Sequence, residues 1–239
     1  MKKLQRSSEL LWLLGVLCVA FGVCLCSKAD LGVSMIAAPA FVLSEALSPL
    51  WHLFSVGVAE YALQGLLLIL LCVLIRHFHW RYLLTFAVAV LYGYTLNLFL
   101  FLMGSVTLDA LWMRWCMLLL GDLSVAFGIA CFFCTYMPLQ VYELFVSELA
   151  NRFHLNLHKT KWVFDISLLA VSITLALLLF GDATTFDWSS IWHTSFHSIG
   201  LGTLVTTAIN SPLIRVMSKL LDKLFDPTPL FPKLQKGLQ

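Results

Sequence analysis

Charged residues are scarce in this sequence. Only 12% of the residues are Asp, Glu, Lys or Arg, whereas 60% are hydrophobic, and the net charge is +2. So small a charge, with the basic residues spread along the chain, argues against a nucleic-acid-binding protein. A single soluble core could not bury this much apolar surface. The sequence therefore predicts an integral membrane protein, with the lipid bilayer covering many of its side chains.

The sequence also lacks the common motifs of catalysis. It contains no nucleotide-binding loop, no nucleophile elbow and no H-E-x-x-H pattern, so we expect neither an enzyme nor a bound cofactor. All seven cysteines lie in apolar stretches, which argues against a disulfide framework. Three pairs have a spacing that could bind a metal: Cys131 with Cys134, His154 with His158, and His193 with His197. No further ligand accompanies either histidine pair, and we expect no metal site.

Long apolar runs are abundant. A spanning helix needs about 20 apolar residues. Six stretches approach this length, at Leu10–Cys26, His52–Ile75, Tyr82–Met103, Leu111–Cys134, Trp162–Phe180 and Trp192–Val216. We predict six transmembrane helices in a single transmembrane domain covering residues 1–239.

The distribution of basic residues predicts the orientation. If the chain begins in the cytoplasm, every Lys and Arg except Lys28 and Arg114 falls in a cytoplasmic segment. Cytoplasmic loops of membrane proteins carry such an excess of Lys and Arg. We therefore expect both termini in the cytoplasm.

The two halves of the chain resemble each other. LGVLCVAFG at 14–22 recurs as LGDLSVAFG at 120–128, and Ser-Glu at 44–45 recurs at 147–148. Each unit holds three spans, so the second must enter the bilayer from the side opposite the first. The predicted fold is an all-α membrane protein of six transmembrane helices in two inverted three-helix repeats. The first repeat covers about 8–104 and the second about 111–217, and 218–239 form a cytoplasmic tail.

Two apolar segments between predicted spans, 31–47 and 137–150, are too short to cross a membrane. Pro39 and Pro138 lie near their beginnings. Because the segments occur as a pair, one in each repeat, we predict re-entrant elements that expose backbone groups to a substrate. Amphipathic helices on the membrane surface are the alternative.

Acidic residues inside a membrane are costly, by about 2.5 to 3.5 kcal/mol on insertion scales, so each suggests a function. Four candidates lie in or near predicted spans: Glu60, Asp122, Asp165 and Glu143. Glu60 has Gln64 one helical turn later. Asp165 lies near a predicted helix end with Lys161 one turn before it, so an interfacial ion pair explains it equally well.

The last predicted span carries a polar stripe in its apolar sequence. Its members fall on one helical face: Thr203, Thr206, Thr207 and Asn210. Asn97, in the third span, has a similar predicted depth. An amide in hydrocarbon needs external partners. Asn97 and Asn210 could therefore bind a polar solute together, or bond to each other as structural glue.

Small residues form matching stripes on the first and fourth spans, at Gly15, Cys18 and Gly22 and at Gly121, Ser124 and Gly128. Such stripes allow close helix packing.

Several segments together resemble the YczE/YyaS/YitT group of bacterial integral membrane proteins, over nearly the whole chain. They are KADLGVS (28–34), APAFVLSEAL (38–47), AEYALQ (59–64), YELFVSELANRFHLNLHKTK (142–161) and GLGTLVTTAIN (200–210). Many members have a P-W-D type segment where this chain has APAF. The resemblance implies a multi-pass protein of the bacterial inner membrane and transfers no biochemical activity.

These observations predict a small secondary transporter or exporter of a polar metabolite. The expected substrate-binding residues are Glu60, Gln64, Asn97, Asp122, Glu143, Thr203, Thr207 and Asn210. The alternative is a non-transporting membrane protein that regulates or assembles with another protein. The expected partners are the lipid bilayer and a small-molecule substrate, and a homodimer is compatible with the sequence.

Overall fold

Nearly all of the described chain is helical. The structure is a computed structural model that describes residues 4–76, 78–181 and 195–228. Its elements are β1 (Leu4–Ser7), α1 (Ser8–Ala29), α2 (Ala38–Leu47), α3 (Val56–Ile75), α4 (Arg81–Leu102), α5 (Leu111–Phe133), α6 (Val141–Arg152), α7 (Leu157–Phe180), α8 (Leu201–Leu224) and β2 (Phe225–Thr228). Within these residues five helices, α1, α3, α4, α5 and α7, are long and apolar enough to cross a membrane. This is the pattern of a helical multi-pass membrane protein.

The predicted spans match these five helices closely, and α8 differs most. Its predicted range began at Trp192, which lies outside the described residues, whereas α8 begins at Leu201 and continues past Val216 to Leu224. Residues 218–224, predicted as part of a tail, are therefore helical. The all-α prediction also missed the parallel pair of β1 and β2. No local pattern could indicate this pairing, because its two strands come from opposite ends of the sequence.

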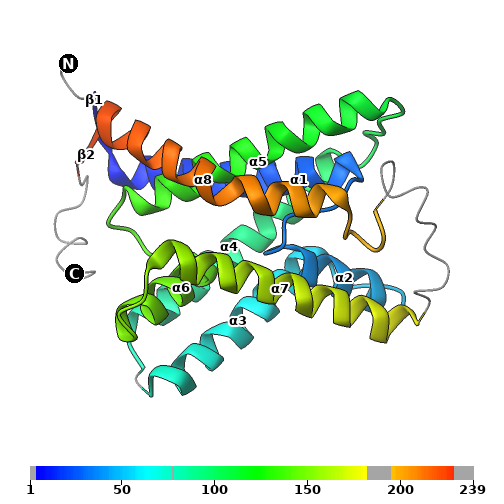
Figure 1. The fold of residues 1–239 in the computed structure, drawn as a ribbon, viewed down its shortest axis with the longest axis horizontal. Coiled ribbons are helices and arrows are strands. Elements are labelled where there is room, and N and C mark those ends of the chain that lie inside the picture. The colour runs from blue at the N-terminus through cyan, green and yellow to red at the C-terminus, as the bar shows by residue number, and fades with distance from the viewer. Residues whose placement is uncertain (1–3, 77, 182–194, 229–239) are drawn as a thin grey trace.

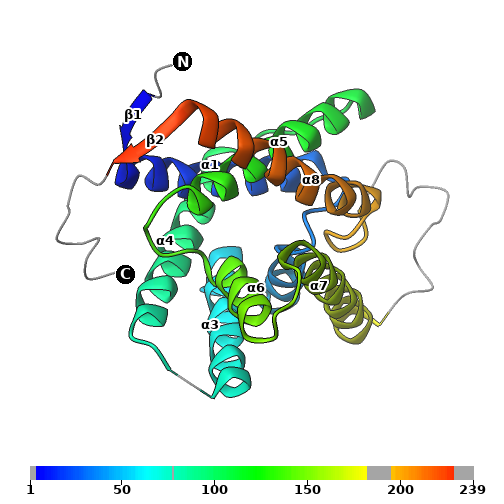
Figure 2. The ribbon, with the colours of Figure 1, turned by 60° about the vertical axis from the view of Figure 1, so that its left-hand side comes forward.

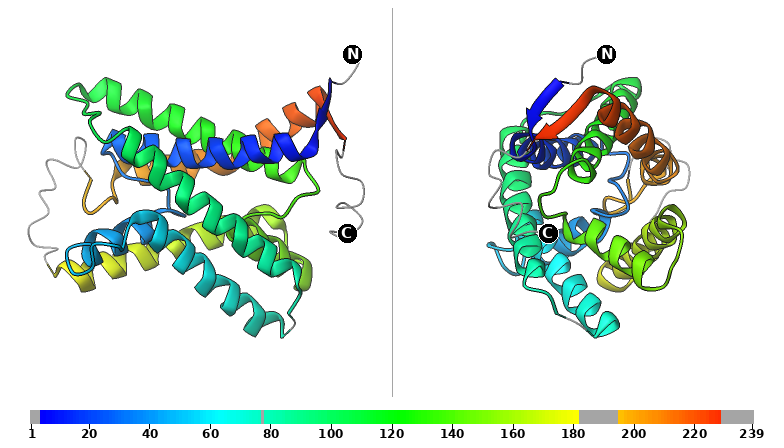
Figure 3. Two further views of the ribbon diagram at one scale, coloured as in Figure 1. Left: turned by 180° about the vertical axis from the view of Figure 1, so that it is seen from behind. Right: turned by 90° about the vertical axis from the view of Figure 1, so that its left-hand side faces the viewer.

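The helices form two groups joined by α4. Helices α1, α5 and α8 lie together on one side, and α2, α3, α6 and α7 lie on the other (Figures 1 and 2). Helix α4 runs diagonally between the groups and packs against both α1 and α3 (Figure 3). Strands β1 and β2 lie at one end of the molecule, called the terminal end below. The start of α5 lies at the opposite end.

Helices α1 and α5 cross at a contact lined by glycine. A Cβ atom added at Gly22 would lie 2.5 Å from the Gly121 carbonyl oxygen, and one added at Gly15 would lie 3.0 Å from that of Gly128. At the middle of the crossing the Ser124 hydroxyl donates to the Cys18 carbonyl at 2.8 Å. Only residues without a side chain permit such close backbone approach. The stripes noted in the sequence therefore face each other.

The short segments form helices inside the fold. Helices α2 and α6 each pack against α3 and α7. The first turns of α2 are buried, including Ala38, Ala40 and Val42, each with no exposed surface. A surface helix would keep one face exposed. Both segments instead lie among the long helices, with the start of α6 directed toward the centre.

The loop between α1 and α2 is attached to the start of α8. The Gly202 amide donates to the Leu31 carbonyl at 2.8 Å, and the Val33 amide donates to the Ser198 carbonyl at 2.9 Å. Gly32 has a φ of 109°, and a Cβ there would lie 2.4 Å from the Thr203 hydroxyl oxygen. Glycine is required at this position, because the backbone conformation and the space both exclude a side chain. These bonds hold the loop against the start of α8 near the opposite end.

Candidate functional site

A cluster of polar side chains is buried where α3, α4 and α6 meet. None of its members is more than 3% exposed. They are Glu60, Gln64, Tyr92, Gln140, Tyr142 and Glu143, called the central cluster below. The cluster contains two carboxyl groups and no basic residue. Buried carboxylates are normally paired, so this imbalance marks a candidate site.

Glu60 is held by neighbours from two helices. Gln64, one turn later on α3, donates from its amide nitrogen to Glu60 Oε2 at 3.4 Å. Tyr142 of α6 donates its hydroxyl to the same oxygen at 3.0 Å. Glu60 Oε1 is buried without a hydrogen-bond partner. The carboxyl group is thus fixed in place with one oxygen free to bind a proton or a cation.

Glu143 lies in the first turn of α6, close enough to Glu60 for their charges to interact. Its Oε2 atom is buried without a hydrogen-bond partner, as is the amide nitrogen of Gln140, the residue before α6. Tyr92 of α4 is within electrostatic range of both carboxyl groups. The start of α6 therefore brings the second acid into the same compartment as the first.

A small cavity adjoins the central cluster. Its volume is about 20 Å³, which is enough for roughly one water molecule. Its walls come from α1, the loop after it, α4, α5 and α6, and they are Val19, Val23, Ser34, Ile36, Ala37, Tyr92, Val125, Ile129, Gln140, Tyr142 and Glu143. A single water or small cation could bind here, but a metabolite could not.

A larger pocket, called the vestibule below, lies between α5, α6, α7 and α8. Its volume is about 410 Å³, within the range of small-molecule sites. Its lining includes residues from the terminal-end halves of α5, α7 and α8: Phe133, Leu157, Lys161, Ser211, Ile214, Arg215, Ser218, Lys219 and Asp222. From α6 it includes Glu143 and Val146. Glu143 thus lines both the small cavity and the vestibule.

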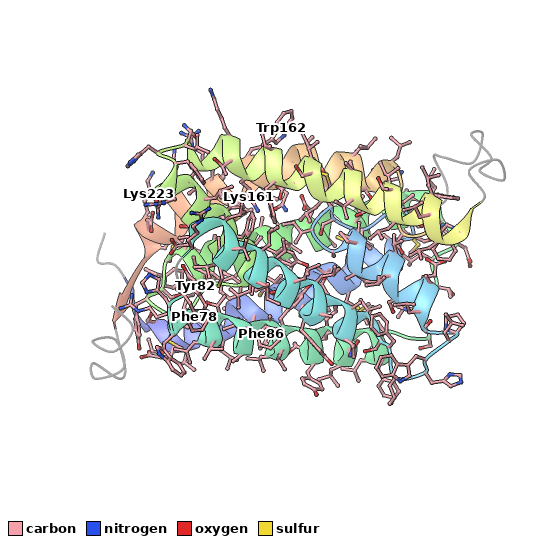
Figure 4. All side chains as sticks on the ribbon, turned by 90° about the horizontal axis from the view of Figure 1, so that it is seen from below. Phe78, Tyr82, Phe86, Lys161, Trp162 and Lys223 are labelled. Atoms are coloured by element: carbon pink, nitrogen blue, oxygen red, sulfur yellow. The ribbon has the colours of Figure 1, made fainter. Side chains whose placement is uncertain are left out.

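Lys161 of α7 is another charged residue that lines the vestibule. Figure 4 shows its side chain turned inward from α7, while that of the adjacent Trp162 points away. Lys161 is 7% exposed, and its Nζ atom lies 3.7 Å from Asp165 Oδ1. The ion pair between Lys161 and Asp165, which the sequence offered as one explanation of Asp165, is therefore present, and both of its members are buried. Lys161 is also close enough to Glu143 for their charges to interact.

Asn97, predicted as a substrate ligand, is occupied elsewhere. Its amide oxygen accepts from the Gly57 amide at 2.9 Å, and its amide nitrogen donates to the Ser55 hydroxyl at 2.8 Å. These bonds fix the first turn of α3 against α4. Asn97 does not bond to Asn210 and lines neither the small cavity nor the vestibule.

Asp122 is also outside both cavities. It lies on α5, is 2% exposed, and neither of its carboxyl oxygens has a hydrogen-bond partner. Its charge acts on Cys26 of α1, the neighbouring helix. It remains a buried acid separate from the central cluster.

The threonine side chains of α8 bond mainly to backbone groups of their own helix and of the residue before it. The Thr203 hydroxyl accepts from the Gly200 amide at 3.2 Å, and the Thr207 hydroxyl donates to the Thr203 carbonyl at 2.7 Å. Asn210 is 5% exposed, and its amide oxygen has no hydrogen-bond partner. The adjacent Ser211 lines the vestibule.

The candidate metal ligands do not converge in the described part of the chain. No group of three or more His, Cys, Asp or Glu residues there could hold a metal ion. Cys131 and Cys134 are free thiols, and His193 lies outside the described residues.

Sequence reasoning identified Glu60, Gln64 and Glu143 but missed their aromatic and basic neighbours. Tyr142 directly precedes Glu143 in a short apolar segment, a signal that could have been weighed. Arg215 and Lys219 were assigned only to the topology. Their common pocket requires the packing of four helices, which no sequence pattern gives.

Comparisons with known proteins give a family without a known activity. No curated protein and no solved structure matches the chain. The family that matches is described as a family of unknown function, DUF6198, and the match extends over residues 6–219. The chain belongs to this family.

Proposed function

We propose that the protein is a secondary transporter of a small polar metabolite, driven by a proton or another small cation that binds at Glu60 and Glu143. The observation that carries this proposal is the position of Glu143, which lines both the interior cavity and the vestibule. A buried acid that lines both spaces provides a route for a cation between the vestibule and the centre of the protein.

The packing supports six spans in two inverted repeats. In chain order, each half has one long helix, one short helix and two long helices. At the α1–α5 crossing, the first glycine of each stripe meets the second glycine of the other, as a twofold axis between the helices requires. Helices α2 and α6 also pack against the same two partners. Inverted repeats that meet around a central site are a recurring architecture of secondary transporters.

The chemistry of the central cluster supports cation coupling. Glu60 and Glu143 repel each other when both are ionised, and Lys161, which is paired with Asp165, offsets only part of this repulsion. A bound proton or small cation would relieve the rest. Charge inside a membrane costs about 2.5 to 3.5 kcal/mol on insertion scales, so the neutralised state is the one able to move. Release of the cation into the vestibule would restore the charged pair.

The ends of the molecule differ in a way that fits alternating access. Toward the terminal end, the vestibule is large enough for a metabolite. Toward the opposite end, His197, just before α8, lies 2.8 Å through Nδ1 from Glu45 Oε1 of α2, so the two helix groups are in contact there. We propose that the terminal end faces the cytoplasm of a bacterial cell, so that the vestibule is the cytoplasmic entrance.

We also propose that the protein is related to the YczE/YyaS/YitT group of bacterial membrane proteins. Two of the segments that carry this resemblance, KADLGVS and GLGT, contact each other through the bond from the Gly202 amide to the Leu31 carbonyl. Their shared role in joining α1 to α8 gives a physical reason for both to recur.

Transport in proteoliposomes tests the proposal. Purified protein would be reconstituted with a proton or sodium gradient and given a defined mixture of amino acids, amines and organic acids, with uptake measured by mass spectrometry. We expect accumulation of at least one component, and a loss of at least about tenfold in Glu60→Gln and Glu143→Gln. Glu148→Gln, on the same helix as Glu143 but outside the cluster, should retain uptake.

Two results would contradict this function. Unchanged uptake in Glu60→Gln would contradict the proposed coupling site. Absence of uptake by the unsubstituted protein under both gradients would contradict transport itself. Folding of each variant would be checked by its elution volume and unfolding midpoint.

A non-transporting partner role is the second candidate. An apolar groove of about 560 Å³ lies between α3, α6 and α7, with Leu67, Phe145 and Val163 in its lining. Such a groove could accept a helix from another membrane protein. This role predicts co-purification with that protein and unchanged function in Glu60→Gln.

A further inference from the structure

The vestibule has charges of opposite sign at separate places. Glu143 lies at its inner wall, 3% exposed, and the Oε2 atom of this residue has no hydrogen-bond partner. Arg215 and Lys219 lie on α8, four residues apart and therefore on one helical face. The two poles come from different helices, so a ligand between them would contact both α6 and α8.

Two bases of α8, Arg215 and Lys219, form the basic pole of the vestibule, and no acid in the described residues is paired with either of them. Neither Arg215 nor Lys219 makes an ion pair in the part of the chain that the structure describes. Both side chains are exposed. Asp222 of α8 lines the same pocket, and its carboxylate accepts a hydrogen bond from the Cys134 thiol at 3.4 Å. Because this donor is neutral, the acid still counts against the two bases, and α8 presents a net charge of +1 to the vestibule.

Lys161 is a third base in the vestibule, but it does not cancel the negative charge at Glu143. It also lines the vestibule, and its ammonium group lies 3.7 Å from the carboxylate of Asp165. Asp165 therefore offsets the charge of Lys161 on α7 itself. A ligand therefore meets the unpartnered oxygen of Glu143 on one side and the net positive charge of α8, from Arg215 and Lys219, on the other.

We propose that the vestibule binds a ligand carrying both an ammonium group and an anionic group, with the ammonium at Glu143 and the anion at Arg215 and Lys219. This inference rests on the proposed transport function and names its substrate class. A simple anion would be repelled by Glu143, and a simple cation would be repelled by the bases of α8. A ligand with both charges satisfies both poles.

Two sources provide this chemistry. One is a free amino acid, whose ammonium and carboxylate groups are separated by one carbon atom. The other is the headgroup of phosphatidylethanolamine, in which a short chain joins an ammonium to a phosphate. The volume of about 410 Å³ accommodates either group.

Binding to the purified full-length protein in detergent tests the inference without requiring transport. The probes are the standard amino acids, their N-acetyl forms, the corresponding amines without a carboxylate, phosphoethanolamine, and short-chain phosphatidylethanolamine and phosphatidylglycerol. Affinity would be measured by calorimetry and by the shift of the unfolding midpoint. We expect binding by an amino acid or an ethanolamine compound, and none by its acetylated form, the plain amine or phosphatidylglycerol.

Variants locate the bound groups. The double variant Arg215→Gln, Lys219→Gln should weaken binding at least about tenfold, and Glu143→Gln should do the same. Lys223→Gln removes a base from the next turn of α8 outside the vestibule, and Glu148→Gln removes an acid from α6 outside it. Both should bind normally. Because Arg215 and Lys219 are exposed, their substitution should leave the fold intact.

The outcomes separate the inference from the proposed function. Binding by an amino acid assigns a free solute, and binding by ethanolamine compounds alone assigns a lipid headgroup. Equal binding of the acetylated or amine forms, normal affinity in the double variant, or no binding by any probe would overturn the inference. Binding without uptake in proteoliposomes would leave the site standing and reject transport, whereas uptake without binding at these residues would do the reverse.

Discussion

The hydroxyl of Tyr142 is the link between α6 and the acid of α3. It donates to Glu60 Oε2 at 3.0 Å, in a compartment that also contains Glu143. Without this donor, Glu60 would keep only the longer bond from Gln64, at 3.4 Å. The tyrosine therefore supports the negative charge of Glu60 and fixes the start of α6 at the same time.

We predict that Tyr142→Phe lowers the free energy of unfolding by roughly 0.5 to 1.5 kcal/mol, because a buried acceptor loses its donor. Unfolding in mixed micelles would measure the change. Tyr61→Phe is the matched control, since no hydrogen bond of the Tyr61 hydroxyl is found in the described residues. In a double-mutant cycle with Glu60→Gln the two changes should not add. Additivity would show that the bond contributes nothing.

The site was only partly predictable from the sequence. Glu60, Gln64 and Glu143 could be identified because an acid in an apolar segment is rare and costly. Tyr142 gave only a weak signal, its position directly before Glu143, because a tyrosine in an apolar segment is not costly in the way that an acid is. Asn97 was predicted to bind substrate, and in the structure both ends of its amide bond to the start of α3. Which polar groups satisfy each other depends on packing between helices distant in sequence.

Helices α1 and α5 pack closely against each other. Their glycines bring the backbones so near that added Cβ atoms would lie within 3.0 Å of the facing carbonyls. The Ser124–Cys18 bond lies at the middle of this contact. The crossing joins the two halves of the chain and fixes one wall of the small cavity, through Val19 and Val125.

Gly22→Ala and Gly121→Ala should each destabilise the protein by roughly 1 to 3 kcal/mol, because the new methyl group would overlap backbone that cannot move aside. The control is Gly65→Ala in α3, where the added Cβ would meet only the ring of Phe86, at 3.1 Å. That change should be nearly neutral, since alanine favours a helix more than glycine does. Unfolding midpoints in detergent would compare the three variants. Equal midpoints for all of them would contradict close packing at the crossing.

The long helices were predictable because length and apolar composition are sufficient to recognise a spanning helix. The two small-residue stripes were visible in the sequence, but their contact with each other is known only from the fold. Helix α8 was harder, because its second half carries Arg215, Lys219, Asp222 and Lys223. Its charges resemble those of a tail, yet packing against α5 keeps the segment helical. The short helices α2 and α6 were recognised as unusual, and their burial required the complete fold.

The molecule as a whole has two different ends. Basic residues gather at the terminal end, where α3 ends, α4 begins and α8 ends, whereas Lys28 and Arg114 lie at the opposite end. There, Arg114 Nη1 lies 3.4 Å from Asp30 Oδ2. Because cytoplasmic segments carry an excess of Lys and Arg, this distribution is the basis for our proposal that the terminal end faces the cytoplasm. The vestibule, bordered by Arg215 and Lys219, would face the same compartment.

Reporter fusions at chosen positions test this arrangement. Alkaline phosphatase should be active after Met103 and after Phe180, because both positions follow helices that end at the opposite end. A fluorescent reporter that folds only in the cytoplasm should work after Arg76 and after Phe153. Opposite results at any one of these sites would contradict the assignment of the adjoining helices.

The fusion after Leu224 is the most informative, because α8 is the helix whose crossing is least evident from its composition. It is not among the five helices that are apolar enough to span by themselves. If α8 crosses, with Arg215 and Lys219 lining the cytoplasmic vestibule, the fluorescent reporter should work after Leu224. If α8 does not cross, alkaline phosphatase should be active there instead. That result would leave five spans, place the chain's end outside and remove the inverted repeat together with the cytoplasmic entrance.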